Sequence, residues 1–245
     1  EFLWPDRAQV TMTAPLMRAY TELLVQTCHK RGTLAIGGMA AFIPSRRDAE
    51  VNRVALEKVR QDKEREAQDG FDGSWVAHPD LVAVCTDVFS NVFEEGRVNQ
   101  KHRKREDVQV TPEMILDFQI PGGEITELGL RNNISVGIQY IAAWLRGTGA
   151  VAIFNLMEDA ATAEIARSQV WQWSHHPEGK LDDGRQVTVE MVQSMIPEEL
   201  AKIRDDYGEA YDEIKMNQAT DLFFKLVAEE EFEEFLTIRA YDQLD

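Results

Sequence analysis

The sequence contains few cysteines, no long apolar run and a deficit of positive charge. With only two cysteines, Cys28 and Cys85, its 245 residues exclude a disulfide framework and a zinc site with four cysteine ligands. No run of about 18 apolar residues is present, so the sequence predicts no membrane-spanning helix and no membrane partner. Because no signal-peptide pattern opens the chain and both cysteines lie in apolar helical patterns that suit reduced thiols, we expect a cytoplasmic protein.

Basic residues are too few for a typical nucleic-acid-binding protein. The 26 lysines and arginines stand against 43 aspartates and glutamates, which gives a net charge of −17. Affinity for a phosphate backbone depends on clustered lysine and arginine side chains. Lys101, Arg103, Lys104 and Arg105 do cluster, but no aromatic residues are interleaved with them. We interpret this segment as a solvated loop and expect no nucleic-acid partner.

Short catalytic and metal-binding motifs are also absent from the sequence. No serine lies in a nucleophile-elbow pattern, and neither cysteine has an obvious activating neighbour. His175 and His176 are adjacent, but they have no third ligand at a spacing typical of zinc sites. Residue spacing alone therefore assigns no enzyme class.

The first part of the sequence alternates helical patterns with short apolar runs. Apolar spacing predicts helices over residues 16–29, over a charged stretch that ends near residue 69, and over residues 81–93. Between them, residues 33–39 and 74–77 are predicted to form short strands. This alternation is typical of the α/β class, in which parallel strands are wrapped by helices.

The long charged helix and the first strand allow more specific predictions. We expect the buried stripe of the helix to be narrow and apolar, formed by Val51, Val54, Ala55 and Val59. Its outer face should be stabilised by opposite charges four residues apart, namely Arg53 with Glu57, Lys58 with Asp62 and Arg60 with Glu64. Gly37 and Gly38 in the strand would allow another part of the molecule to approach the backbone closely.

A polar, basic segment over residues 96–112 predicts a domain boundary, which we place between residues 105 and 106. Beyond it, helical patterns dominate. The predicted helices cover residues 134–145, 160–173, 197–211, 219–226 and 229–236. The acidic run that opens the last of them predicts a solvated helix start, where carboxylates interact favourably with the helix dipole.

Glu158 and Asp159 end an apolar stretch immediately before one of these helices. Adjacent side chains point in different directions, so the two carboxylates cannot face one site as a dyad. One of them is expected to cap the helix, which is the usual role of a carboxylate at that position, while the other is free. A general base presented by the turn remains the alternative to a purely structural cap.

Several longer motifs, in a consistent order along nearly the whole chain, are similar to those of one enzyme family. Among them are Ile36-Gly37-Gly38-Met39-Ala40-Ala41, Asp72-Gly73-Ser74-Trp75-Val76-Ala77-His78-Pro79, Gly129-Leu130-Arg131-Asn132-Asn133-Ile134 and Asn155-Leu156-Met157-Glu158-Asp159-Ala160-Ala161-Thr162. These motifs resemble malate synthases of the A type. The resemblance implies that residues 1–105 are the last strands and helices of a (β/α)₈ TIM barrel. It also implies that residues 106–245 are an all-α C-terminal plug domain carrying the catalytic aspartate.

The resemblance further implies a reaction and the residues that serve it. Malate synthases join acetyl-CoA to glyoxylate in a Claisen-type condensation of the glyoxylate cycle and hydrolyse the product to malate and CoA. By this resemblance, Asp159 is the base that removes a proton from the acetyl methyl group. Trp75 is similar to the aromatic residue that packs against glyoxylate, while Met39 and Pro79 are similar to residues that line the acyl and pantetheine channel.

The resemblance implies Mg²⁺ as the cofactor that holds the glyoxylate aldehyde. The metal-binding acids and an arginine that stabilises the enolate are expected upstream of this chain, so none of its own residues is predicted to be a metal ligand. We therefore expect poor activity without the N-terminal half of the enzyme as a partner, because enolate formation needs fixed positive charge. A non-catalytic acidic helical interaction module stays open as the alternative function.

Overall fold

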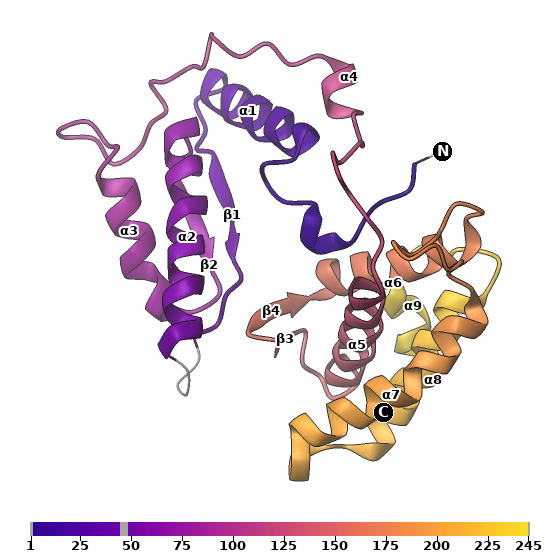
Figure 1. Ribbon diagram of the computed structural model, residues 1–245. Coiled ribbons are helices and arrows are strands. Elements are labelled where there is room, and N and C mark those ends of the chain that lie inside the picture. The colour runs from indigo at the N-terminus through magenta and orange to yellow at the C-terminus, as the bar shows by residue number, and fades with distance from the viewer. Residues whose placement is uncertain (1, 45–48, 245) are drawn as a thin grey trace. The chain divides into compact units, whose positions relative to one another are not determined.

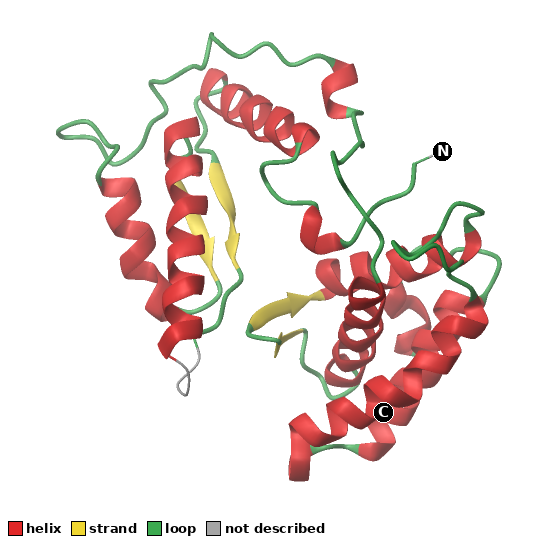
Figure 2. Cartoon of the chain, in the orientation of Figure 1, coloured by secondary structure: helices red, strands yellow, loops and turns green. Residues whose placement is uncertain are grey.

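The chain folds into two units, each with its own apolar core. The structure is a computed structural model that describes residues 2–44 and 49–244. Unit 1 comprises Glu1–Thr11, Gln119–Ile153 and Glu158–Asp245, and unit 2 comprises Met12–Phe118 and Phe154–Met157. Helices make up most of the described residues, and the strands are short (Figure 2).

Unit 2 contains two parallel strands joined through a long helix. β1 (Ile36–Ala40) and β2 (Gly73–Val76) pair with Ile36 opposite Gly73. Figure 1 shows α2 (Ala49–Asp69), which connects them, lying across the strand pair with α3 (Val82–Ser90) beside it. The remaining elements are α1 (Pro15–Lys30), η2 (Pro79–Leu81) and α4 (Pro112–Ile115). The predicted α/β class and the parallel pairing are confirmed.

Two small apolar clusters form the core of unit 2. One lies where α1, α2 and α3 meet, and it consists of Val25, Ala35, Ala67, Phe71, Val88 and Phe89. The other consists of Ala40, Phe42, Val59, Leu81 and Cys85. Both cysteines of the chain are free thiols, as a sequence without a disulfide framework requires.

The predicted buried stripe of α2 is confirmed only in part, because Ala55 is partly buried against the cluster that contains Val59. Val51 and Val54 are exposed, and Val59 is the member of that set that is buried. The other buried positions of the helix are Lys63, Glu66 and Ala67, so the face that packs inward is displaced toward the C-terminal half and carries two charges. Apolar spacing cannot reveal such a face, because a lysine and a glutamate are normally counted as polar.

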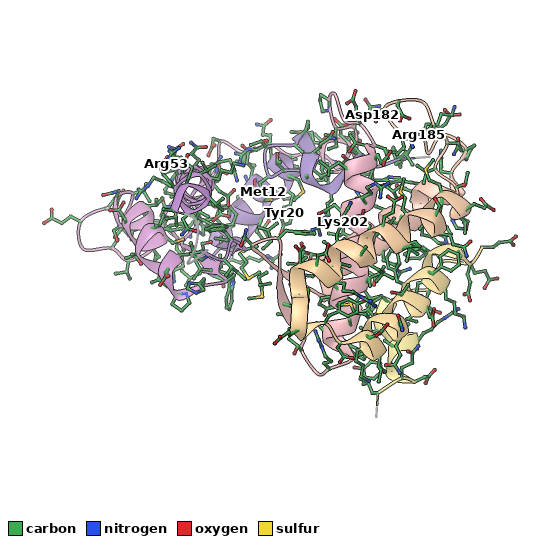
Figure 3. The ribbon with its side chains drawn as sticks, turned by 60° about the horizontal axis from the view of Figure 1, so that its bottom comes forward. Met12, Tyr20, Arg53, Asp182, Arg185 and Lys202 are labelled. Carbon is green, nitrogen blue, oxygen red and sulfur yellow. The ribbon has the colours of Figure 1, made fainter. Side chains whose placement is uncertain are left out.

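Two arginines of α2 hydrogen bond to acids other than the predicted ones, although the charges of Glu57 and Glu64 still act on them. Arg53 donates to Glu50 in the preceding turn, and its side chain lies on the solvent-facing side of the helix (Figure 3). Arg60 donates to Asp87 of α3 at 2.8 Å. An exposed arginine side chain can pair with any of several nearby acids at similar free energy, so each such pair contributes little to stability.

The charges buried by α2 satisfy one another and the backbone of β1. Lys63 Nζ donates to both carboxylate oxygens of Glu66 at 3.0 Å and to the carbonyl oxygen of Gly38 at 2.7 Å. The Gly38 N–H donates to Glu66 Oε1 at 3.0 Å. A Cβ on Gly37 would overlap the Glu66 carboxylate, so the close approach predicted from the glycine pair is the approach of this side chain. Burial raises the pKa of Glu66, while the charge of Lys63 opposes that shift.

Unit 1 is organised around a helix that is buried on nearly every side. α5 (Glu127–Trp144) contacts α6 (Ala160–His175), α7 (Val189–Tyr207) and α8 (Glu213–Ala228). At Gly137 the approach of α8 is so close that a Cβ would overlap the Phe223 ring. The predicted helices over 134–145 and 160–173 are confirmed by α5 and α6.

In unit 1, one predicted helix start and one predicted helix are wrong. α7 begins at Val189, because the Thr188 hydroxyl accepts a hydrogen bond from the Met191 N–H, and Pro197 lies inside the helix. The predicted helix over 229–236 does not form: α8 ends at Ala228, and α9 (Leu236–Tyr241) begins at the end of that stretch. Glu229 is instead paired with Arg239 of α9, so the acidic run is a linker rather than a helix start.

A hairpin that the sequence did not predict leads into α6. β3 (Ala150–Ile153) and β4 (Leu156–Asp159) form a two-stranded sheet, with positive φ at the two linking residues, Phe154 and Asn155. Residues 154–157 belong to unit 2, where Met157 donates from its N–H to the carbonyl oxygen of Ala41 at 2.8 Å. Across the described ranges the strands form two-stranded sheets, and no closed barrel is present.

The helices that the structure describes include none that combines the length and the apolar composition needed to cross a lipid bilayer.

The buried pair in α2 gives a stability prediction. Lys63→Met leaves the Glu66 carboxylate buried without its cation, so we expect the free energy of unfolding to fall by about 3 kcal/mol near neutral pH. Removal of Lys63 raises the pKa of Glu66 further, which favours the protonated carboxyl in the folded state. The loss should therefore shrink as the pH is lowered toward the ordinary range of glutamate. Urea denaturation from about pH 5 to about pH 8 measures both effects.

Lys58→Met is the matched control, because Lys58 lies on the exposed side of the same helix. Its effect is expected to stay within about 0.5 kcal/mol at every pH. A Lys63→Met variant with the same stability deficit at low and neutral pH would contradict the role given to Glu66.

Candidate functional site

Asp159 lies at the junction of β4 and α6 and caps the helix. Its Oδ1 accepts a hydrogen bond from the Thr162 N–H at 3.0 Å, and the Asp159 N–H donates to Thr162 Oγ1 at 3.0 Å. The two residues thus form a reciprocal capping box. In the described part of the chain, Asp159 Oδ2 accepts no hydrogen bond and Asp159 has no ion pair. The cap leaves one carboxylate oxygen of a half-buried aspartate available.

The neighbouring acid, Glu158, is bound as well, so the expectation that one acid of the pair caps the helix while the other is free is wrong. Glu158 is 2% exposed, and its two carboxylate oxygens accept hydrogen bonds from the two Nη atoms of Arg7. Arg7 belongs to the short helix η1 (Arg7–Gln9) near the start of the chain. The structure therefore separates the two carboxylates: Glu158 is neutralised by an arginine, and Asp159 is the one that remains accessible.

Tyr140 of α5 lies within the electrostatic reach of Asp159. Its hydroxyl donates to the carbonyl oxygen of Gly149 at 3.1 Å, and its side chain is almost completely buried. Burial raises the pKa of Tyr140, and the negative charge of Asp159 adds to that rise. The Asp159 carboxylate is thus near enough to Tyr140 for its charge to act on that hydroxyl.

Met39, Trp75 and Pro79 belong to unit 2. Met39 lies in β1 and Trp75 in β2, at 41% and 65% exposure, so the paired strands present a thioether and an indole at neighbouring positions. Pro79 opens η2 just after β2 and is also exposed. Parallel strands are normally covered on both faces, so large exposed side chains on this pair mark a surface that can receive a ligand or further chain.

Asp72 fixes the start of the strand that carries Trp75. Its Oδ2 accepts from the Ala35 N–H at 2.7 Å and lies 2.9 Å from Nε2 of His29. Its Oδ1 accepts from the Gln100 N–H at 2.5 Å. These contacts tie the beginning of β2 to α1 and to the loop after α3, which limits the freedom of the residues that follow.

The basic segment is a loop, as predicted, but its cations are not simply solvated. Three of its cations donate to backbone carbonyls at the ends of α1 and α2: Lys104 to His29, Arg103 to Gln68 and Arg105 to Asp69. Cations at helix C-termini satisfy the last carbonyls and interact favourably with the helix dipole. The cluster therefore stabilises unit 2 and is not a free cationic surface.

Comparison with known proteins assigns these features to a family. A family model described as malate synthase, TIM barrel domain, matches residues 1–118, and one described as malate synthase, C-terminal, matches residues 124–244. The chain is 56% identical to malate synthase of Streptomyces clavuligerus over 99% of its length. It is 49% identical to malate synthase of Myxococcus xanthus and 43% identical to malate synthase A of Escherichia coli, over 98% and 97% of its length. The chain belongs to the malate synthase family.

The chain spans about half the length of the malate synthases that it matches. It covers 45% of the Streptomyces clavuligerus protein and 44% of each of the other two. The two family models meet between residues 118 and 124, close to the point where unit 2 gives way to unit 1. The residues before Met12 match the TIM-barrel model, while their contacts place them in unit 1 with the C-terminal helices.

The residues present do not fit the Mg²⁺ that the resemblance to malate synthases implies. Within residues 2–44 and 49–244, no group of three or more His, Cys, Asp or Glu side chains is arranged to hold a metal ion. Glu158 is occupied by Arg7, and His175 Nδ1 lies 2.8 Å from the carbonyl oxygen of Trp171.

Sequence reasoning missed the contribution of Arg7 to this site. Arg7 and Glu158 are 151 residues apart, and no local spacing connects them. The available signal was the pair of adjacent acids itself, because a second carboxylate in a buried turn requires a cation from elsewhere.

The capping geometry allows the structural role of Asp159 to be tested by itself. Asparagine caps a helix about as well as aspartate, so Asp159→Asn should change the free energy of unfolding by no more than about 0.5 kcal/mol. Asp159→Ala removes the acceptor for the Thr162 N–H and should cost about 1 kcal/mol. Thermal and urea denaturation of both variants test this difference. Equal stability of the alanine and asparagine variants would show that the cap does not form.

Proposed function

We propose that this chain contributes the general base and part of the acyl channel of a malate synthase. The reaction is the condensation of acetyl-CoA with glyoxylate, followed by hydrolysis to malate and CoA. The proposal depends on one observation, which is how the carboxylate of Asp159 is hydrogen bonded in a chain of this family. It is fixed by a capping box through one carboxylate oxygen, keeps the other available, and stands next to an acid that is already neutralised.

In the proposed reaction, Asp159 takes a proton from the methyl carbon of acetyl-CoA. The resulting enolate forms a carbon–carbon bond to the aldehyde carbon of glyoxylate, and the aldehyde oxygen becomes the hydroxyl oxygen of malate after protonation. Water then cleaves the malyl thioester, which gives malate and CoA. A carboxylate that is held in place before substrate arrives favours this proton transfer, because the reacting atoms need not be brought together at that moment.

The remaining assignments come from the resemblance to malate synthases and concern residues that lie in unit 2. Trp75 packs against glyoxylate, while Met39 and Pro79 line the acyl and pantetheine channel. Residues 1–105 form the last strands and helices of a TIM barrel, and residues 106–245 form the helical plug domain that carries Asp159. The exposed positions of Met39 and Trp75 on a parallel strand pair support these assignments. A cytoplasmic location is part of the same proposal.

Positive charge for the reaction must come from outside the described residues. An enolate oxygen and a glyoxylate aldehyde both require cationic stabilisation. In the part of the chain described here, the cation hydrogen bonded to the Asp159 turn is Arg7, and it is engaged by Glu158. We infer that Mg²⁺ and its ligands, together with an arginine, are supplied by the remainder of the enzyme, and that this chain alone is nearly inactive.

A CoA-release assay with acetyl-CoA, glyoxylate and Mg²⁺ tests the proposal. The chain is measured alone and after addition of a polypeptide comprising the other half of a malate synthase. We expect turnover in the mixture, and a fall of about 10² to 10⁴ in rate when the mixture contains Asp159→Asn. Because this variant keeps the helix cap, the loss reports on chemistry rather than folding.

Two results would contradict the proposal. Full activity of the Asp159→Asn mixture would remove Asp159 from the mechanism, and full activity of the isolated chain would remove the dependence on a second polypeptide. Association of the two polypeptides without CoA release would instead support the non-catalytic interaction module.

A further inference from the structure

A single guanidinium group joins both sides of the turn that carries Asp159. Arg7 Nη1 donates to Glu158 Oε2 at 3.1 Å and to the carbonyl oxygen of Thr162 at 3.3 Å. Arg7 Nη2 donates to Glu158 Oε1. The residue before Asp159 and the residue that completes its capping box are therefore held by the same side chain.

Glu158 cannot leave this arrangement at low cost. It is buried, and a buried carboxylate needs hydrogen-bond donors or a cation in place of water. The two-point contact with Arg7 supplies both and also fixes the plane of the carboxylate. If residue 158 moved away from the guanidinium, its carboxylate would become exposed or remain buried without a partner. The backbone that leads into Asp159 is therefore restrained.

Arg7 is itself held from two directions. The preceding residue, Asp6, accepts hydrogen bonds from the Thr126 N–H at 2.9 Å and the Thr126 hydroxyl at 2.6 Å, at the start of α5. Pro5 accepts from Gln169 Nε2 of α6 at 2.8 Å. The segment that presents Arg7 is thus attached to the two helices that flank the turn, and the guanidinium has a fixed position relative to both.

We propose that Arg7 and Glu158 are positioning residues that set the direction of the Asp159 carboxylate. The inference rests on the proposed function of Asp159 as a base. Asp159 Oδ1 is used by the helix cap, so the direction of Oδ2 depends on the backbone at residues 158–162. Arg7 holds that backbone through its hydrogen bonds to Glu158 and to the carbonyl oxygen of Thr162. A misplacement of about 1 Å in a reacting group lowers a rate by about 10²-fold, so the hydrogen bonds of Arg7 to this turn are relevant to catalysis.

A second buried ion pair in unit 1 provides the comparison. Glu199 of α7 is buried to a similar degree as Glu158, and it accepts from Arg131 Nη1 of α5 at 3.0 Å. This pair stabilises the contact between two helices, and the partners of Glu199 are Arg131 and Lys202 rather than residues 158–162. Glu199→Gln therefore matches Glu158→Gln in chemistry and burial without touching the turn.

The experiment compares Arg7→Gln, Glu158→Gln and the double variant with Glu199→Gln and the unsubstituted chain. The first readout is amide hydrogen exchange of Thr162 in the chain alone, measured by NMR against the exchange of core amides in α5. The second is kcat and KM for acetyl-CoA after addition of the other half of the enzyme. The two readouts are independent, since the first needs no activity.

We expect the Thr162 amide to exchange at least about tenfold faster in Arg7→Gln and Glu158→Gln, while core amides change less. We expect kcat to fall about 10- to 100-fold with KM nearly unchanged, because the acetyl-CoA site is intact and only the base is misdirected. The double variant leaves no unpaired buried charge, so it should recover stability but not kcat. Arg7→Lys, which keeps the charge but not the two-point contact, should restore kcat only in part.

Failure of this inference is distinguishable from failure of the proposed function. Wild-type Thr162 exchange and kcat in Arg7→Gln, together with inactivity of Asp159→Asn, would overturn the positioning role and leave the base in place. A fully active Asp159→Asn would overturn the proposed function itself. A kcat loss in Glu199→Gln equal to that in Glu158→Gln would show that any buried pair has this effect, which also overturns the inference. If Arg7→Gln does not fold, the double variant carries the same test.

Discussion

A carboxylate can be buried only where cations and N–H groups replace its hydration, and both units contain a carboxylate under this constraint. In unit 2, Glu66 binds Lys63 and the Gly38 N–H, which holds α2 against β1. In unit 1, Glu158 binds Arg7, which holds the N-terminal segment against the turn before α6. Each buried acid thereby fixes two segments that are distant in sequence.

The same constraint explains how the candidate site distinguishes two adjacent acids. Glu158 is neutralised by Arg7, while Asp159 forms a helix cap with one oxygen and keeps the other accessible. In the proposed reaction, a carboxylate held in this way would need no reorganisation before it accepts a proton, which is the basis of electrostatic preorganisation. The positive charge that the same proposal requires for the enolate is a separate requirement, which we propose the remainder of a malate synthase supplies.

Local patterns predicted much of the fold. The helical periods that predicted α1, α5 and α6 and the short apolar runs that predicted β1 and β2 depend on neighbours within a few residues, so they are visible in the sequence. The inward face of α2 was predicted only in part. Lys63 and Glu66 are polar residue types, and they are buried because they pair with each other. The linker at Glu229 was taken for a helix start because its partner, Arg239, lies in the next helix.

The sequence by itself determined where most helices and strands form, that Asp159 stands at the start of a helix, and which family its motifs resemble. These properties follow from spacing, capping chemistry and residue identity, which are local. Only the tertiary structure decided that Asp159 rather than Glu158 keeps an available oxygen, and that the basic segment caps two helices. Those outcomes depend on ion pairs and hydrogen bonds between residues that are far apart in the chain. Such residues become neighbours only when the chain folds, so sequence spacing does not reveal them.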